Sequence, residues 1–169
     1  MAWTAPKTWS SEPLTSLDLN ANVRDNLNHL KDRLDRTAGK FISGQSMLST
    51  TATEFVDVDA VNLSLTLTTH GGDVLLGFTG TVQSTASNGS VFFNVAVDNV
   101  DYVADDGIIR HNIGASFDNR RDKPLSFVML IPDLSAGSHT FKLRWKANSG
   151  NAARMEVVSL HPQFWAKEI

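Results

Sequence analysis

The chain has no cysteine among its 169 residues. This absence excludes disulfide bridges, thiolate nucleophiles and cysteine-ligated metals, so stability has to come from packing and from association with other chains. The sequence also lacks a run of about 18 apolar residues that would span a bilayer, and the basic start and apolar run of a signal peptide. We therefore expect synthesis and folding in a cytoplasm, without insertion into a membrane.

Clustered positive charge is missing as well. Lysine and arginine number 15 against 18 aspartates and glutamates, which gives a formal net charge of −3. Proteins that bind nucleic acid normally carry dense positive charge on one surface. The densest cationic run, residues 120–123, is interrupted by Asp122 and is typical of a solvated loop. We therefore expect no nucleic-acid partner.

Motifs that carry enzyme chemistry are absent too. The five histidines are scattered singly, and none has the spacing of the histidine pair in a cupin-type metal site. The sequence holds neither a nucleophile elbow nor a glycine-rich phosphate loop. We therefore predict that the chain is not an enzyme, with no catalytic residue, no cofactor and no bound metal.

Several acidic residues leave weaker alternatives open. Asp57 and Asp59 share one face of an expected strand, an arrangement open to glycosidase chemistry, but such neighbours at a strand end are usually solvated. Residues 105–107 favour a turn. The simplest interpretation of His139 is a hydrogen bond within its own turn. A loop calcium site is the alternative, with ligands drawn from Asp98, Asp101, Asp105 and Asp106.

The first third of the chain differs in character from the rest. Residues 1–14 have no consistent period and are rich in tryptophan and proline, which predicts an extended arm. A helix is expected to begin at Thr15, because the Thr15 hydroxyl suits a cap and Asp18 is placed to reach back to it. Leu14 and Leu19 have the spacing of a hydrophobic staple across this boundary.

Apolar residues within this helix form one narrow seam, comprising Val23, Leu27, Leu30 and Leu34, with Asn20 continuing it backward. Thr37 extends the seam forward, and Gly39 and Gly44 bracket the expected exit from the helix. Two interpretations stay open: the helix lies on its own β body, or it joins a self-associating bundle in which a buried Asn20 sets the register.

The arm carries large aromatic side chains with no strand to bury them. Trp3 and Trp9 each present about 150–250 Å² that is costly to leave in water. They have to dock on their own body or on a neighbouring subunit, and we favour the neighbour. The predicted anchoring residues are Trp3, Trp9, Leu14 and Leu19. The predicted oligomerisation residues are Asn20, Val23, Leu27, Leu30 and Leu34.

Beyond the helix the apolar period changes to two, which predicts strands with one buried face. The alternating residues lie within 61–67, 76–82, 93–97, 125–131 and 141–147. Turn signals separate these runs at 70–73, 87–90, 136–138 and 148–151, and Asp98-Asn99 is a candidate two-residue hairpin. About eight strands without intervening helices predict an antiparallel jelly-roll β-sandwich, with a carbohydrate-module-like sandwich as the alternative.

Two aromatic positions in this β region have separate interpretations. Trp145 is in phase with Phe141 and Leu143, so we expect it in the core and not on a sugar-stacking surface. Residues 164–165 are expected to close the last strand against the sandwich or an oligomer interface.

Residues 9–15, followed by Leu19-Asn20 and then residues 23–27, resemble the opening of many small tailed-bacteriophage and prophage virion proteins. Residues 137–145, with Ser149-Gly150, look like the penultimate strand of jelly-roll heads on phage fibres and in C1q/TNF-like domains. Pro13 departs from the aliphatic residue that such openings often carry. The resemblance implies a virion structural protein whose amino-terminal segment attaches it to the particle.

Together these observations predict a mainly β protein with two parts. Residues 1–40 form an anchoring arm and one short oligomerisation helix, and residues 45–169 form the jelly-roll head. The predicted function is that of a non-enzymatic phage virion protein, a capsid decoration or head fibre with a trimeric head. A tail-fibre or receptor-binding tip is the alternative, and a carbohydrate-binding sandwich is a further one.

The expected partners follow from this prediction. They are further copies of the chain, other virion proteins of the capsid, neck or tail, and a host-surface glycan or protein. Contact with a host would use the loops near residues 84–90, 98–106 and 118–123. The expected location is the virion, after assembly in the host cytoplasm.

Overall fold

The computed structural model describes residues 13, 15–34, 36–44, 46–85, 89–112, 122–148 and 150–169. By its internal contacts the chain divides into two units, Met1–Thr37 and Ala38–Ile169. The predicted arm residues Trp3, Trp9 and Leu14 lie outside the described residues, so their docking stays a prediction.

The first unit contains one uninterrupted helical run. It consists of α1 (Ser16–Leu19), a π-helical segment η1 (Asn20–Arg24) and α2 (Asp25–Leu34). Thr15 is the cap residue, as predicted: its hydroxyl oxygen accepts a hydrogen bond from the Asp18 amide at 3.2 Å. Capping of this kind satisfies an amide that has no partner within the helix.

The helix ends earlier than its sequence suggests. Thr37 and Gly39 do not belong to the helix or to its exit, because both lie in strand β1 (Thr37–Phe41). A side-chain carbon at Gly39 would stand 3.5 Å from the Cβ atom of Trp165. Gly39 thus lies inside a strand, in ordinary packing contact with the next strand, and the prediction that it marks the helix end was wrong.

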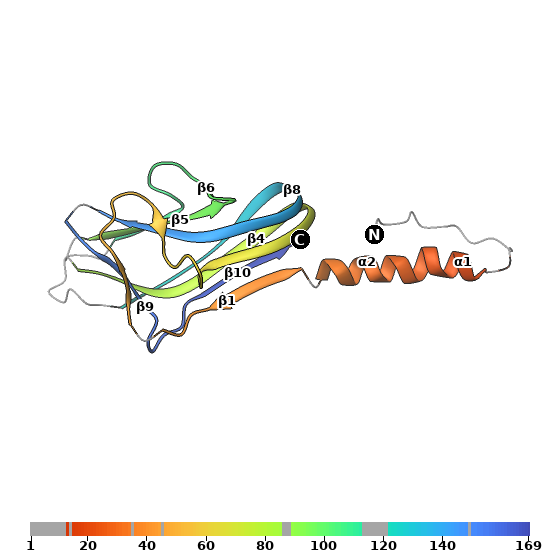
Figure 1. Cartoon of the computed structure of the whole chain (residues 1–169), viewed down its shortest axis with the longest axis horizontal. Helices are drawn as coiled ribbons and strands as arrows, with labels where there is room; N and C mark the ends of the chain where they lie inside the picture. Colours follow the sequence, from red (N-terminus) through yellow and green to blue (C-terminus); the bar gives the residue numbers. More distant parts are fainter. Residues whose placement is uncertain are drawn as a thin grey trace. The chain divides into compact units, whose positions relative to one another are not determined.

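The described residues of the second unit form an antiparallel β-sandwich, which confirms the predicted fold class (Figure 1). Its main strand order is β1-β10-β4-β8-β5-β6; β2 pairs with β9, β3 with β8, and β7 with β5. The remaining bounds are β2 (Leu48–Thr50), β3 (Val56–Asp57), β4 (Ser64–Ser84), β5 (Ser90–Val97), β6 (Val100–Asp101), β7 (Ile109–Asn112), β8 (Lys123–Ala147), β9 (Ala153–Glu156) and β10 (Gln163–Glu168).

Strands β4 and β8 are long, pair with each other along most of their length and share a bend. The expected turns at 70–73 and 136–138 were wrong, because both segments lie inside these strands, with Thr69 opposite Gly137. Gly71, Gly72 and Gly137 take positive φ values there, and the register shifts between Gly72 and Val74. Glycine permits such a bend without ending the hydrogen-bonded ladder.

The bends let the sheet close over one core. The rings of Phe78 in β4 and Phe93 in β5 stack with their centroids 5.8 Å apart, although these strands are not hydrogen-bonded neighbours. Trp145 is 1% exposed in this core, as predicted. Val61 differs from its prediction: it is 71% exposed and sits in a turn before β4, where its amide bonds to Asp59.

Candidate functional site

The helix carries an apolar stripe that its own chain leaves open. We use the name helix stripe for Leu19, Val23, Leu27 and Leu30, whose exposed fractions are 47%, 45%, 59% and 46%. These residues recur at spacings of four, four and three, so they lie along one side of the helix. The structure thus brings four of the predicted site residues into one line; the side chain of Leu34 is outside its description.

A π-helical turn lies within this stripe. The Asp25 amide donates to the Asn20 carbonyl, and Asn20 itself is half-buried. On one side of the turn, the side-chain amide of Asn22 donates to the Asp18 backbone carbonyl at 3.1 Å. On the other side, the side-chain amide of Asn26 donates to the Asn22 backbone carbonyl at 3.3 Å. Single π turns are rare in helices and are found frequently at functional sites.

The two carboxylates weighed for glycosidase chemistry have separate structural roles. Asp57 lies near two cations of β8, with Oδ2 3.5 Å from Lys142 Nζ and Oδ1 3.4 Å from Arg144 Nε. Asp59 holds a turn by accepting hydrogen bonds from the amides of Val61 and Asn62. Burial opposes ionisation of Asp59, but the hydrogen bonds from Asn62 and Val61, together with the charge of Lys40, outweigh it and lower the pKa of this carboxyl.

The loop carboxylates considered for calcium also have other partners. Asp98 binds His139, Asp101 accepts from Arg144 at 2.8 Å, and Asp106 lies 3.4 Å from Lys146 Nζ. The predicted turn at 105–107 is present, with positive φ at Asp105 and Gly107. Within the described part of the chain, no three His, Asp or Glu side chains are grouped so that they could hold a metal ion.

The predicted hairpin at Asp98-Asn99 is confirmed. Both residues have positive φ, and Val97 pairs with Val100 across the turn. Both ring nitrogens of His139 face hydrogen-bond acceptors, with Nδ1 2.8 Å from Asp98 Oδ2 and Nε2 2.9 Å from the Ser135 carbonyl. The second of these bonds is the predicted local one, although it spans the strand bend at Gly137 and not a turn, so His139 has a structural role.

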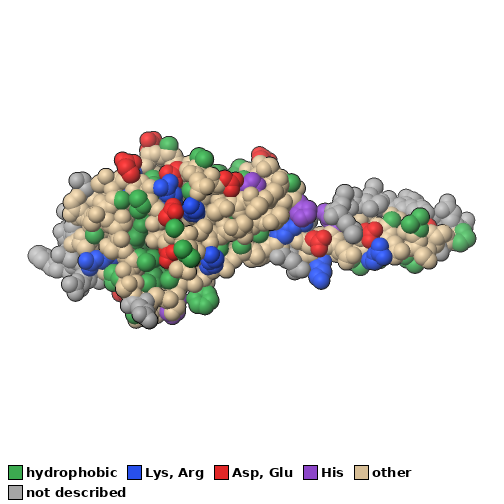
Figure 2. All heavy atoms as spheres, viewed as in Figure 1, with side chains coloured by type: hydrophobic (Ala, Val, Ile, Leu, Met, Phe, Trp, Pro, Cys, Tyr) green, Lys and Arg blue, Asp and Glu red, His purple; other side chains and the backbone are tan. Residues whose placement is uncertain are grey.

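One outer face of the sandwich, that of β5 and the end of β8, is charged and internally paired. Besides the ion pairs of Asp57 and Asp101, the Lys146 ammonium lies 4.8 Å from the ring centre of Phe55 and 5.2 Å from that of Phe92. Such cation–π contacts satisfy a lysine that is largely covered. Figure 2 shows acidic and basic side chains intermixed on the body in the view that it presents.

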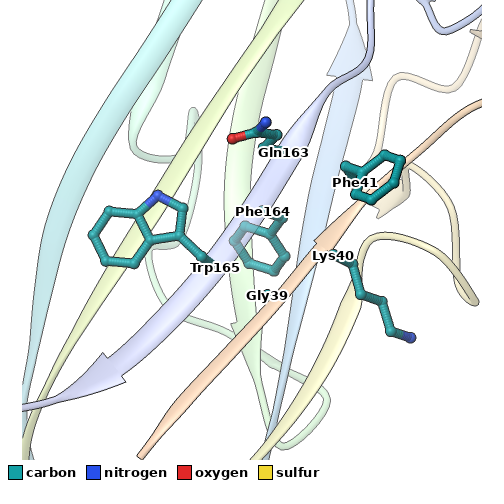
Figure 3. Close-up of a pocket in the computed structure, with 6 residues that line it drawn as sticks. All are labelled: Gly39, Lys40, Phe41, Gln163, Phe164 and Trp165. Carbon is teal, nitrogen blue, oxygen red and sulfur yellow. The ribbon is translucent and has the colours of Figure 1, made fainter. Parts of the chain in front are cut away.

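A hollow of about 260 Å³ lies between strands β1 and β10 on the other side of the fold. Its lining residues are Gly39, Lys40, Phe41, Gln163, Phe164 and Trp165, and Figure 3 shows the Trp165 indole extending away from β1. A side-chain carbon at Gly77 of β4 would stand only 2.1 Å from this indole, so the ring lies over Gly77. Phe164 is fully buried in the core.

The sequence analysis did not predict that the side of β8 that faces away from the core is apolar. The signal is the uninterrupted apolar run at residues 127–131, which is typical of a strand buried on both faces. Reading it as a simple alternation assigns Phe127, Met129 and Ile131 to the core and leaves Val128 without a role. In the structure, Val128 is 64% exposed.

Comparison with known proteins identifies no family. No family model matches the sequence, and no curated protein matches it. Among the helices of the described residues, none has the length and apolarity needed to cross a bilayer.

The solved structures that are similar include vertex protein P5 of PRD1, with 15% identity over 79% of this chain and 96% of that chain, and a TM-score of 0.47. Eiger TNF from S. frugiperda matches with 13% identity over 79% and 94%, and a TM-score of 0.42. The CBM36-1 domain of a multidomain xylanase from the hindgut metagenome of Trinervitermes trinervoides matches with 11% identity over 75% and 95%, and a TM-score of 0.35. These identities and scores are too low to indicate a shared function.

Proposed function

We propose that this chain is a non-enzymatic structural protein of a phage virion, a capsid decoration or head-fibre protein, that acts as a homotrimer. Its amino-terminal segment attaches it to the particle, and its jelly-roll head is displayed outward. The observation that carries this proposal is the helix stripe, in which Val23, Leu27 and Leu30 stay about half exposed within a single chain.

A stripe of this kind favours association with other chains. A helix of this length is marginal in water and gains most of its stability by packing its apolar face. Apolar residues at spacings of three and four match the seam of a helical bundle, in which a polar residue such as Asn20 sets register. A bundle of three such helices would hold three heads together at the particle surface.

The identity of the particle is supported by the sequence resemblance. Residues 9–15, 19–20 and 23–27, which resemble the opening of small phage virion proteins, include the Thr15 cap and three of the four residues of the helix stripe. Trp3 and Trp9, together with Leu14 and Leu19, are the proposed attachment residues. Their partners are other virion proteins of the capsid, neck or tail.

The absence of catalysis is supported by what the candidate groups do. Apart from His111, whose pKa is lowered by burial and whose buried Nε2 has no hydrogen-bond partner, the described groups with shifted pKa values are Asp59, Asp98 and His139, each hydrogen-bonded to neighbouring backbone. They lie in turns and at a strand bend, where such bonds stabilise the fold. A general acid or base instead has to reach a substrate.

Self-association is tested by the mass of the full-length protein in solution. Leu27→Asp places a charge in the helix stripe and is expected to reduce a trimer to a monomer, because burying an unpaired charge is costly. Leu17→Asp is the matched control: Leu17 is 77% exposed and lies two residues from Leu19, on the opposite side of the helix. A monomeric wild-type chain would contradict the proposed trimer.

Attachment is tested with particles. The Trp3→Ala/Trp9→Ala double variant is expected to form the same oligomer as the wild type in solution and to lose co-sedimentation with virions that lack the protein.

Deleting the gene from a phage that encodes this chain separates the two virion roles. Particles that lose thermal resistance support decoration or a head fibre, whereas normal particles that fail to adsorb would indicate a tail-fibre tip. Glycan binding by the full chain without particle binding would instead indicate a carbohydrate-binding sandwich.

A further inference from the structure

The sheet formed by β1, β10, β4 and β8 has an apolar surface on the side away from the core. Directly paired residues share a face, so the register of these strands assigns its members. Trp165, Gly77 and Val128 form one row, and Lys167, Leu75 and Leu130 form the next. Phe41 shares its side with Gly39, which packs beside Trp165. We use the name outer apolar face for Phe41, Leu75, Val128, Leu130 and Trp165.

This face is open to solvent in the single chain. Phe41, Val128 and Leu130 have exposed fractions of 66%, 64% and 44%. Inward neighbours on the same strands, such as Leu76, Phe78 and Phe164, are 2% exposed or less. Strands β4, β8 and β10 therefore carry apolar side chains on both of their faces, although their own sandwich covers one.

The opposite outer face provides a comparison within the same fold. There Lys142, Arg144 and Lys146 alternate along β8 and meet acidic partners or aromatic rings. This solvent-facing sheet surface thus carries charges that are paired with one another. In the two rows of the outer apolar face, the charged residue is Lys167. Contiguous exposed apolar surface marks an interaction site in soluble proteins.

We propose that the outer apolar face is the surface through which the β-sandwich heads of neighbouring copies of this chain pack against one another. The proposal rests on the self-association in the proposed function and extends it from the helix to the head. A second copy is the occupant because only residues 35 and 36 separate the end of α2 from β1, a strand of this same sheet. Such a link spans at most about 10 Å.

The short link has a geometric consequence. If the helices of several copies pack in parallel through the helix stripe, the β1 strand of every copy starts close to the end of that bundle. The starts of the β1 strands are then close together, which favours contact between the sheets that contain them. Packing Phe41, Val128 and Leu130 between copies removes their apolar area from water, which stabilises the assembly.

The chain has no cysteine, so single-cysteine variants of the full-length protein report on this face. We would measure the rate of maleimide labelling in Val128→Cys and in Val100→Cys, alongside the mass of each variant. Val100 is the matched control because it is 70% exposed and lies in β6, outside this face. In the assembled protein we expect Val128→Cys to label roughly tenfold more slowly than Val100→Cys, since a covered thiol is inert. Denaturant should abolish the difference.

A second pair of variants covers the case in which Val128→Cys does not fold. Leu130→Cys and Phe41→Cys, on two other strand positions of the face, are expected to show the same protection. Equal labelling at Val100 and at the face positions within an oligomer would overturn the inference while leaving helix-driven assembly intact. A monomeric mass for the wild-type chain would overturn both, and loss of particle binding alone would overturn neither.

Discussion

His139 Nδ1 lies 2.8 Å from Asp98 Oδ2 and ties the β5–β6 hairpin to strand β8. The other oxygen of Asp98 accepts a hydrogen bond from the Thr140 amide at 2.8 Å, and this bond, with the one to His139, lowers the pKa of Asp98. The bond to Asp98, with that to the Ser135 carbonyl, raises the pKa of His139. The pair therefore holds a turn of positive φ in place most strongly when both groups are charged.

This pair predicts a pH window for stability. Because the pKa of His139 is raised in the folded state, the stability that this residue contributes is fully present below the unfolded pKa of about 6.5. This stability is lost as the pH rises through the folded pKa. Because the pKa of Asp98 is lowered in the folded state, the stability that it contributes is present above the unfolded pKa of 3.8 and is lost as the pH falls through the folded pKa. The stability lost in His139→Gln should therefore be greatest between about pH 4 and 6.5.

Thermal unfolding of the wild type and His139→Gln at several pH values measures this window. Because Asp98 is about half exposed, we expect a loss of no more than about 1 kcal/mol, or roughly 3 °C. His70→Gln makes the same substitution at an exposed histidine of β4 and provides the control. A difference between wild type and His139→Gln that does not vary with pH would contradict the charged pair.

Gly107 and Gly150 offer a matched pair of backbone positions. Their φ values are +76° and +79°, so an alanine at either position meets the same left-handed strain of about 1 kcal/mol. A side-chain carbon at Gly107 would also lie 2.5 Å from the Phe93 carbonyl oxygen, which accepts from the Ile108 amide; at Gly150 nothing lies within 4 Å. We expect Gly107→Ala to cost at least about 1 kcal/mol more than Gly150→Ala, because backbone has to move. Equal free energies of unfolding would contradict this clash.

Features that depend on neighbouring residues can be predicted from this sequence. The Thr15 cap is set by atoms three residues apart, and the Asp98-Asn99 hairpin by two residues that tolerate positive φ. The phase of Trp145 with Phe141 likewise assigns both to the core.

Features that depend on pairing between distant segments cannot be predicted in the same way. A pair of glycines at 71–72 fits a turn or a bend equally well, and the choice depends on the partner strand, where residue 137 is also a glycine. Gly39 suits a helix end until Trp165 is known to pack beside it. The outer apolar face cannot be predicted in this way, because apolar–polar alternation identifies one buried face of a strand and does not show whether the other face is also apolar.

The stacking of Phe78 on Phe93 predicts a large core effect. Phe78 is 2% exposed, and its ring centre also lies 5.6 Å from that of Phe127. Phe78→Ala therefore leaves a cavity between β4 and β5, which are not hydrogen-bonded neighbours. We expect it to destabilise the protein by about 3–5 kcal/mol in denaturant unfolding. Val61→Ala, at a position 71% exposed, should change stability by less than about 0.5 kcal/mol. A similar cost for both variants would argue against a core at Phe78.

The Thr15 cap predicts a link between helix formation and assembly. Thr15→Ala removes the oxygen that accepts the Asp18 amide and is expected to cost the helix about 1 kcal/mol. Because a frayed first turn misplaces Leu19, the first residue of the helix stripe, the variant should lose helical circular dichroism and dissociate at a higher protein concentration than the wild type. Thr15→Asn keeps a side-chain acceptor and should behave like the wild type. If Thr15→Ala loses helicity while its mass at low concentration is unchanged, the helix start does not contribute to assembly.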